Sequence, residues 1–370
     1  MFTTLAMHMP NELLSLPVAA GTIVLAAVVV CVAAWRARRT LDPATLPLMG
    51  VMGAFVFAAQ MINFPVLPGV SGHLGGAVLL AVLLGPWAAI LTMTAILMVQ
   101  CLLFADGGLL ALGCNIINIG VVPALLGGGL FRMLRGAIAS PRRLYLAAWV
   151  GATAGVVAGA ALVPLQVAAS GVLLIPLTTF LAAMVGVHVV IGLAEGAITF
   201  AVLAYLQRTR PQLFGRAGDG LASHNVPSAI PHDAAGRPGY AAVLVSILGA
   251  ALLLAGVGAW FVSTHHDGLD ASLAPERNNG PVVIHNETPA VARANAIQEA
   301  IVLLPDYTKP QADPADDEVA HATMGDELAH WDPNVSGWTS LAGLLGTVVT
   351  LGLVYGVARL LRRRSNHVTA

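Results

Sequence analysis

Long apolar runs separated by short polar breaks dominate this chain. A run of about 20 mostly apolar residues is long enough to cross about 30 Å of hydrocarbon as a helix. The pattern predicts nine such helices, near residues 16–35, 46–62, 74–85, 87–104, 109–131, 144–168, 178–206, 240–262 and 338–358. The third is short, because Gly85 and Pro86 end it. The pattern therefore predicts an all-α integral membrane protein.

Composition agrees with a membrane protein. Hydrophobic residues make up 57% of the 370 residues and charged residues only 10%, far from the values of soluble domains. Cys31, Cys101 and Cys114 lie in apolar runs without CxxC spacing, so we expect buried thiols and neither disulfides nor a thiolate metal site. The first apolar run has its positive charge on the far side, in WRARR. No cleavable signal peptide is therefore expected, and this run should remain a helix.

Arginines are distributed unevenly between the polar breaks. Fifteen of them follow the first, fifth, seventh and ninth predicted helices: Arg36, Arg38, Arg39, Arg132, Arg135, Arg142, Arg143, Arg208, Arg210, Arg216, Arg237, Arg359, Arg362, Arg363 and Arg364. Because Lys and Arg are retained on the cytoplasmic side, nine crossings from an outside N-terminus place all fifteen there. The charges therefore predict a multi-pass protein of the cytoplasmic (inner) membrane, with an extracytoplasmic N-terminus and a cytoplasmic C-terminus.

Polar segments divide the chain into two membrane domains. Seven predicted spans in residues 7–206 precede a proline-containing cytoplasmic linker, 207–239. Residues 240–370 form a two-span auxiliary domain with an extracytoplasmic loop, 263–337. This loop holds thirteen acids, three bases and the histidines His265, His266, His285, His321 and His330. Within it, 290–304 has helical apolar spacing, and the rest is predicted to be a solvated loop.

Two histidines at the outer face are candidate metal ligands. The predicted topology places Met7-His8 and the segment 63–76 on the same side, so His8 and His73 can meet. A free amine on Met7, the backbone nitrogen of His8 and its imidazole can form fused chelate rings, and His73 can add a fourth nitrogen. Four nitrogens suit Ni(II), Cu(II) or Co(II) better than Mg or Ca. The alternative is an interfacial His8 and a loop His73 without metal.

The same segments resemble a known transporter family. MHMPNELL, residues 7–14, resembles the start of the CbiM/NikM family, and residues 61–122 and, less tightly, 186–200 are similar to its characteristic regions. This family comprises substrate-binding membrane components of energy-coupling factor importers for cobalt and nickel. The resemblance implies capture of Ni(II) or Co(II) by Met7, His8 and His73. It does not separate the two metals.

The auxiliary domain carries a second resemblance. STHHDGLDASL, 263–273, resembles the Pro-Asp-Gly-Leu-Glu signature of a two-span PDGLE domain found fused to such proteins or encoded beside them. His266 replaces the proline and Asp270 the glutamate, so Asp267, Gly268 and Leu269 are the identities. The resemblance implies that the auxiliary loop approaches the metal-binding mouth and assists loading.

Transport energy is expected to come from other subunits. The chain has one lysine, Lys309, and no GxxxxGK[ST] phosphate-binding loop. The resemblance implies a coupling membrane subunit and a pair of ATPase subunits on the cytoplasmic side. The chain itself is expected to be a non-catalytic component, with membrane lipid around it, a transported divalent metal ion, no cofactor and no nucleic-acid partner.

Two other functions stay open from the sequence. An ATP-independent secondary transporter or channel for divalent metal would work without ATPase partners. An intramembrane metal-dependent enzyme would need a general base, yet the chain has no HExxH motif, and Glu195 is the only acid deep in the seven predicted spans.

Further polar residues lie within or beside the predicted spans. His188 and Glu195 are seven residues apart on one helical face, and Asn115 and Asn118 are three apart on another. Either pair can orient the proposed ligand His73 by hydrogen bonds without contacting the metal, although hydrogen bonding between helices is the simpler hypothesis. Asp106, in FADGGL, is expected to close a short outer turn.

The start of the chain departs from the family pattern in two ways. Pro10-Asn11-Glu12 stands where Pro-Asp-Gly is usual, which alters the turn without removing chelating atoms. Residues 1–6 would also convert the Met7 amine into an amide. We therefore hypothesise that the working chain begins at Met7.

Overall fold

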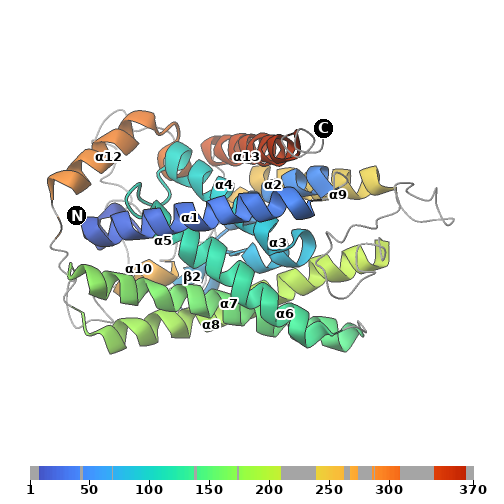
Figure 1. Cartoon of the computed structure of the whole chain (residues 1–370), viewed down its shortest axis with the longest axis horizontal. Coiled ribbons are helices and arrows are strands. Elements are labelled where there is room, and N and C mark those ends of the chain that lie inside the picture. The colour runs from blue at the N-terminus through green and yellow to red at the C-terminus, as the bar shows by residue number, and fades with distance from the viewer. Residues whose placement is uncertain are drawn as a thin grey trace.

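The structure is a computed structural model, and it describes residues 8–41, 45–68, 70–136, 140–172, 175–209, 239–261, 267–273, 286, 288–308 and 337–363. It is mostly helical (Figure 1). The first region contains η1 (Asn11–Leu13), α1 (Leu16–Thr40), α2 (Leu46–Gln60), β1 (Phe64–Leu67), β2 (Val70–Gly72), α3 (Ala77–Leu84), α4 (Pro86–Phe104), α5 (Leu112–Asn115), two π-helical segments, η3 (Ile116–Val121) and η4 (Pro123–Gly127), α6 (Gly128–Arg135), α7 (Pro141–Ser170) and α8 (Leu177–Thr209). The second contains α9 (Tyr240–Gly256), η6 (Gly258–Phe261), α10 (Gly268–Leu273), α12 (Pro289–Ile301), η7 (Pro305–Tyr307) and α13 (Gly337–Arg363).

Each predicted span contains helix, but the helices differ in length. Within the described residues, six helices are long and apolar enough to cross a membrane: Leu16–Thr40, Pro86–Phe104, Leu112–Arg135, Arg142–Ser170, Leu177–Thr209 and Gly337–Arg362. The helices α2 and α9 are shorter. The fully buried α3 has only 8 residues, so it extends about 12 Å and does not span hydrocarbon by itself. The structure therefore supports a multi-pass membrane protein, and the count of seven plus two spans stays a prediction.

A β-hairpin interrupts the helices before His73. Phe64 pairs with Gly72 and Pro65 with Ser71 in antiparallel register. Pro65 and Pro68 fix φ and lack a backbone N–H, which disfavours helix here, so a purely helical expectation misses this element. The buried strand β2 ends at Gly72, which places His73 at the edge of the bundle interior.

The two regions pack directly against each other. Helices α7 and α8 lie side by side, and α2 contacts both α9 and α13 (Figure 1). A Cβ added to Gly346 in α13 would overlap the Phe57 ring of α2, so glycine permits this close approach. Figure 1 shows α12 and the N-terminal end of α1 at the same end of the bundle. The second region thus shares the packing of the first.

Two smaller expectations have different outcomes. The predicted amphipathic helix at 290–304 is present as α12, and Thr288 caps its N-terminus by accepting a hydrogen bond from the Val291 N–H. Cys101 and Cys114 are buried, whereas Cys31 is exposed on α1. The prediction of a buried thiol was wrong for Cys31, because α1 directs most of its side chains away from the other helices.

Candidate metal-binding site

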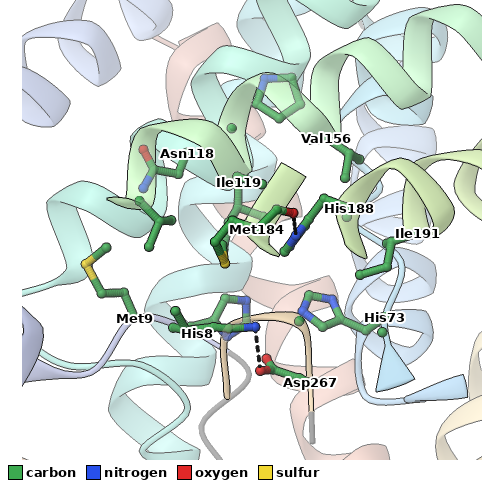
Figure 2. A pocket seen from close by; sticks show the side chains of 18 of the residues that line it. His8, Met9, His73, Asn118, Ile119, Val156, Met184, His188, Ile191 and Asp267 are labelled. Carbon is green, nitrogen blue, oxygen red and sulfur yellow. Dashed lines mark hydrogen bonds between the residues drawn. The ribbon is translucent and has the colours of Figure 1, made fainter. Parts of the chain in front are cut away.

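A cavity of about 100 Å³ lies where the N-terminal segment, the hairpin and α8 meet. His8, His73 and His188 line it, together with Glu195 and Asp267 (Figure 2). These residues come from four separate parts of the chain: the N-terminal segment, the loop after β2, α8, which supplies two of them, and the residue that precedes α10. The remaining lining is largely apolar, including Met9, Met184 and Ile191.

His8 and His73 face each other in this cavity, as predicted. Their ring centroids are 5.4 Å apart and the rings are tilted by 53°. His8 is only 2% exposed. Its Nε2 atom is buried and has no hydrogen-bond partner among the described residues. The meeting of the two side chains is thus observed, and their role as metal ligands stays a prediction.

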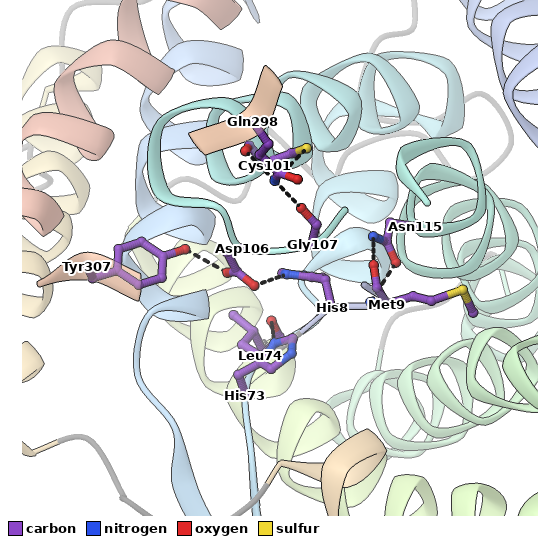
Figure 3. A network of polar contacts seen from close by, with 10 residues as sticks. All are labelled: His8, Met9, His73, Leu74, Cys101, Asp106, Gly107, Asn115, Gln298 and Tyr307. Carbon is purple, nitrogen blue, oxygen red and sulfur yellow. Dashed lines mark hydrogen bonds and ion pairs between the residues drawn. The ribbon is translucent and has the colours of Figure 1, made fainter. Parts of the chain in front are cut away.

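Asp106 is the partner of His8, which sequence reasoning did not find. Its Oδ1 lies 2.7 Å from His8 Nδ1, and Tyr307 donates its hydroxyl to Oδ2 at 2.7 Å (Figure 3). Burial alone would raise the pKa of Asp106, but the charge of His8 and hydrogen bonds from His8 and Tyr307 hold that pKa below its ordinary value. The Asp106 carboxylate accepts from the Tyr307 hydroxyl at one oxygen and faces His8 at the other, so we assign the proton between Asp106 and His8 to His8 Nδ1.

Asp106 closes the short outer turn through its backbone, as expected, while its side chain contacts His8. The backbone closes this turn, with Asp106 N–H donating to the Gln100 carbonyl and Ala105 and Gly107 at φ 57° and 89°. The sequence did contain one signal: an acidic residue at the end of an apolar span is energetically costly unless its carboxylate has a partner. Nothing local identifies that partner as His8 or Tyr307.

The loop between α4 and α5 holds the N-terminal segment. Asn115 accepts a hydrogen bond from Met9 N–H at 3.1 Å and donates to the Met9 carbonyl at 3.2 Å (Figure 3). Gly108 N–H also donates to that carbonyl, at 3.0 Å. A Cβ on Gly107 would lie 2.9 Å from the Cβ of His8, so glycine is needed for this approach. Asn115 thus fixes the backbone next to His8.

Glu195 and Gln60 fix the loop that follows His73. The Glu195 carboxylate accepts the N–H groups of Gly75 and Gly76 at 2.8 and 3.1 Å. Gln60, which sequence reasoning missed, donates from Nε2 to the Gly75 carbonyl at 2.8 Å. His73 Nδ1 donates to the Leu74 carbonyl at 3.2 Å, so a neutral His73 has its lone pair on Nε2.

His188 and Asn118 make contacts within or between helices. His188 donates from Nδ1 to the Met184 carbonyl at 2.7 Å and still lines the cavity. Asn118 exchanges two side-chain hydrogen bonds with Gln166 in α7, at 2.7 and 2.9 Å. For Asn118 the simpler hypothesis of bonding between helices is therefore confirmed.

The auxiliary region reaches the N-terminal segment through α12. Asn11 donates to Asn295 at 2.6 Å, and Asn295 donates to Glu12 at 2.7 Å. Gln298 donates to the carbonyls of Cys101 and Gly107, at 3.0 and 2.7 Å. The two residues that depart from the family's usual start, Asn11 and Glu12, are therefore the ones that contact α12.

One predicted donor, Met7, lies outside the described residues. The loop histidines His265, His266, His285, His321 and His330 lie outside them as well. Within the described ranges, no group of three or more His, Cys, Asp or Glu side chains is arranged to hold a metal ion. Two histidine side chains alone do not complete a four-nitrogen site, so main-chain or terminal nitrogens would have to contribute.

Comparison with known proteins identifies the family. The profile described as cobalt uptake substrate-specific transmembrane region matches residues 8–213, and that of the PDGLE domain matches 241–363. A protein of Archaeoglobus fulgidus described as a fused nickel transport protein is 30% identical over 357 residues, covering 96% of this chain and 99% of its own length. One of Haloquadratum walsbyi described as a metal transport protein is 41% identical over 208 residues, 56% of this chain and 93% of its own.

A solved structure of a truncated transition metal transporter is also similar, with 31% identity, a TM-score of 0.48, and coverage of 54% of this chain and 98% of its own. The family profile covers more than half of the chain, and the Archaeoglobus relative is similar along almost its entire length. The chain therefore belongs to the CbiM family of cobalt uptake substrate-specific transmembrane proteins and carries a fused PDGLE domain.

Proposed function

We propose that this protein captures Ni(II) or Co(II) at the extracytoplasmic face, as the substrate-binding membrane component of an ATP-driven energy-coupling factor importer. The observation that carries the proposal is the approach of His8 and His73 in a buried cavity, 5.4 Å between ring centroids. Imidazole nitrogens favour Ni(II) and Co(II) over oxygen-seeking Mg and Ca. Family membership and relatives described as nickel and metal transport proteins point the same way.

The proposed donors are the Met7 amine, the His8 backbone nitrogen, the His8 imidazole and the His73 imidazole. The Met7 amine is available only if the working chain begins at Met7. Asn115 holds the backbone beside His8, and Glu195 holds the backbone after His73. We assign both a positioning role, because groups that orient metal ligands commonly change metal affinity by about 10- to 100-fold. His188 is placed beside the metal without binding it.

The proposed topology has seven spans in residues 7–206, a cytoplasmic linker at 207–239 and two spans in 240–370. The extracytoplasmic loop is 263–337, the N-terminus lies outside and the C-terminus inside. Arg36, near the end of α1, lies 5.7 Å from the ring of Trp87, near the start of α4. The arginine-bearing end of α1 and the start of α4 therefore share one end of the bundle, while Asp106, just beyond the end of α4, contacts His8.

The proposed partners are a coupling membrane subunit and a pair of ATPase subunits, docked on the cytoplasmic side. The chain contains no GxxxxGK[ST] motif, so ATP hydrolysis through such a loop must occur in other subunits. Uptake measured with and without these subunits tests this part of the proposal. Undiminished uptake in their absence would contradict it and favour a secondary transporter.

The test of the site is nickel and cobalt titration of the purified protein in detergent. We expect His73→Ala to lose high-affinity binding while it remains monodisperse and helical by circular dichroism. His188→Ala is the matched comparison, because His188 lines the same cavity but is assigned no metal bond. It should stay within a few-fold of the wild-type affinity. Wild-type affinity in folded His73→Ala would refute the proposed site.

A further inference from the structure

The structure places Asp106 on the His8 nitrogen that the proposed chelate needs. A chelate ring between the backbone nitrogen and the imidazole of one histidine must pass through Cα, Cβ and Cγ to Nδ1. Nε2 lies on the far side of the ring and cannot reach an ion held by the same residue's backbone nitrogen. In the structure, His8 Nδ1 lies 2.7 Å from Asp106 Oδ1. One ring nitrogen cannot keep this donated proton and bind a metal ion at the same time.

We propose that Asp106, anchored by Tyr307 of the PDGLE region, is the resting partner of His8 and that metal capture replaces this carboxylate with the metal at Nδ1. The inference rests on the proposed function, and it adds two positioning residues and an order of events. Before metal arrives, His8 donates from Nδ1 to Asp106. When metal binds, the His8 ring changes tautomer: Nδ1 releases its proton to solvent and binds the metal, and Nε2 takes up one proton from solvent, so the ring neither gains nor loses a proton overall.

Tyr307 holds Asp106 in place from the auxiliary region. Its hydroxyl donates to Asp106 Oδ2 at 2.7 Å (Figure 3). Its ring stacks on Phe104, with the ring centroids 4.6 Å apart. Burial and the neighbouring Asp106 raise the pKa of Tyr307 well above its ordinary value, so the hydroxyl remains a donor. Both carboxylate oxygens of Asp106 thus have a partner: His8 of the first region at Oδ1 and Tyr307 of the PDGLE region at Oδ2.

The segment that carries Tyr307 is itself fixed in a demanding conformation. The N–H groups of Leu303 and Leu304 both donate to the Leu103 carbonyl, at 3.0 and 3.1 Å. Asp306 and Tyr307 then adopt left-handed φ values of 48° and 59°, which are unfavourable for residues other than glycine. Such conformations persist where the surrounding structure holds them, commonly at functional sites. Here the left-handed pair directs the Tyr307 side chain into the core.

Through Tyr307 and Asp106, the PDGLE region thus affects how readily His8 Nδ1 can exchange its hydrogen bond for a metal ion. Removing the Tyr307 hydroxyl leaves Asp106 free to turn away from His8, which makes the exchange easier. The substitution Tyr307→Phe keeps a ring on Phe104 and keeps the charge of Asp106. A role in packing alone would leave nickel capture unchanged in this variant, whereas Tyr307→Leu would disturb packing as well.

The first measurement is ¹⁵N NMR of histidine-labelled full-length protein in detergent, with and without Ni(II). His8→Gln assigns the His8 signals by their loss. We expect a proton on His8 Nδ1 in the metal-free protein and its loss when nickel binds. An Nδ1 that keeps its proton in the nickel-bound protein would overturn the exchange and assign Nε2 as the ligand atom.

The second measurement is the rate of nickel capture by stopped-flow. One hydrogen bond corresponds to roughly two- to tenfold in rate, and we expect Tyr307→Phe to capture nickel faster by about that factor. Tyr145→Phe is the control, because Tyr145 contacts Trp149 and Phe200 on α7 and α8. An unchanged or slower rate in Tyr307→Phe would overturn the inference. Nickel binding that is indifferent to both His8→Ala and His73→Ala would instead refute the proposed function.

Discussion

The Asn115 side-chain amide makes two hydrogen bonds to the backbone of Met9: it accepts from the Met9 N–H at 3.1 Å and donates to the Met9 carbonyl at 3.2 Å. This paired contact fixes the backbone one residue after His8, from a helix that lies more than a hundred residues further along the chain. Asn118, three residues later, uses its amide on Gln166 instead. Asn115 therefore contacts the backbone beside His8, whereas Asn118, which also lines the cavity, bonds between helices.

We expect Asn115→Ala to weaken nickel binding by roughly 10- to 100-fold, the usual effect of losing a group that orients a metal ligand. Asn118→Ala should lower thermal stability and leave nickel affinity within a few-fold of wild type. Calorimetric titration and a thermal unfolding assay on both variants check this. Equal losses of affinity would show that general destabilisation, and not the Met9 contact, controls the site.

Glu195→Gln should weaken nickel binding because an amide cannot accept both N–H groups. The carboxylate accepts from Gly75 and Gly76, and the glutamine amide group would oppose one of these donors. Loss of a buried, charge-assisted hydrogen bond costs about 1.5–3 kcal/mol, so we expect a measurable drop in melting temperature together with reduced affinity. Glu299→Gln, on the exposed face of α12, is the control. A Glu195→Gln protein with unaltered affinity would remove Glu195 from the positioning role.

Intact mass measurement should find a chain that begins at Met7, because the proposed donor set needs a free amine there. We expect the wild-type protein with bound nickel to lack residues 1–6. A version blocked by acetylation at Met7 should bind nickel far more weakly, since one of four donors is lost. High-affinity binding by a chain that retains residues 1–6 would show that other donors complete the site.

Gly346→Ala should destabilise the contact between α13 and α2. The added methyl group would overlap the Phe57 ring and lie 3.0 Å from Phe104 Cε2, and overpacking of this kind costs about 1–3 kcal/mol. Gly352→Ala in the same helix is the matched control, because a Cβ there has no neighbour within 4 Å. The expected result is a lower melting temperature for Gly346→Ala alone. Similar melting temperatures for both variants would argue against tight packing of α13 on α2.

Local signals in the sequence predicted the helices and the two histidines. Span length and arginine placement depend on near neighbours, so they located helix in every predicted range. The hairpin at 64–72 was missed because residues 63–76 were interpreted only as an extracytoplasmic segment between two predicted spans, and strands of 4 and 3 residues are too short to show a clear alternation. The shortness of α3, by contrast, was predicted from Gly85 and Pro86, which end it.

Partners of buried polar groups could not be predicted in the same way. Asp106 meets His8 across 98 residues and Tyr307 across 201. Gln60 reaches Gly75 because the β1–β2 hairpin between them turns the chain back on itself. Each contact depends on tertiary packing, and a single sequence records only that an acid or amide in an apolar context needs some partner.

The contacts between Asn11 and Asn295, and between Asp106 and Tyr307, have a consequence for biosynthesis. The ribosome makes the N-terminal segment first, yet its α12 neighbour is 284 residues later and Tyr307 is later still. The early helices are therefore made before Tyr307 and α12 have been translated, so these contacts near His8 form only afterwards. A ribosome stalled before residue 307 would leave a membrane-inserted protein whose His8 lacks the Tyr307-anchored carboxylate.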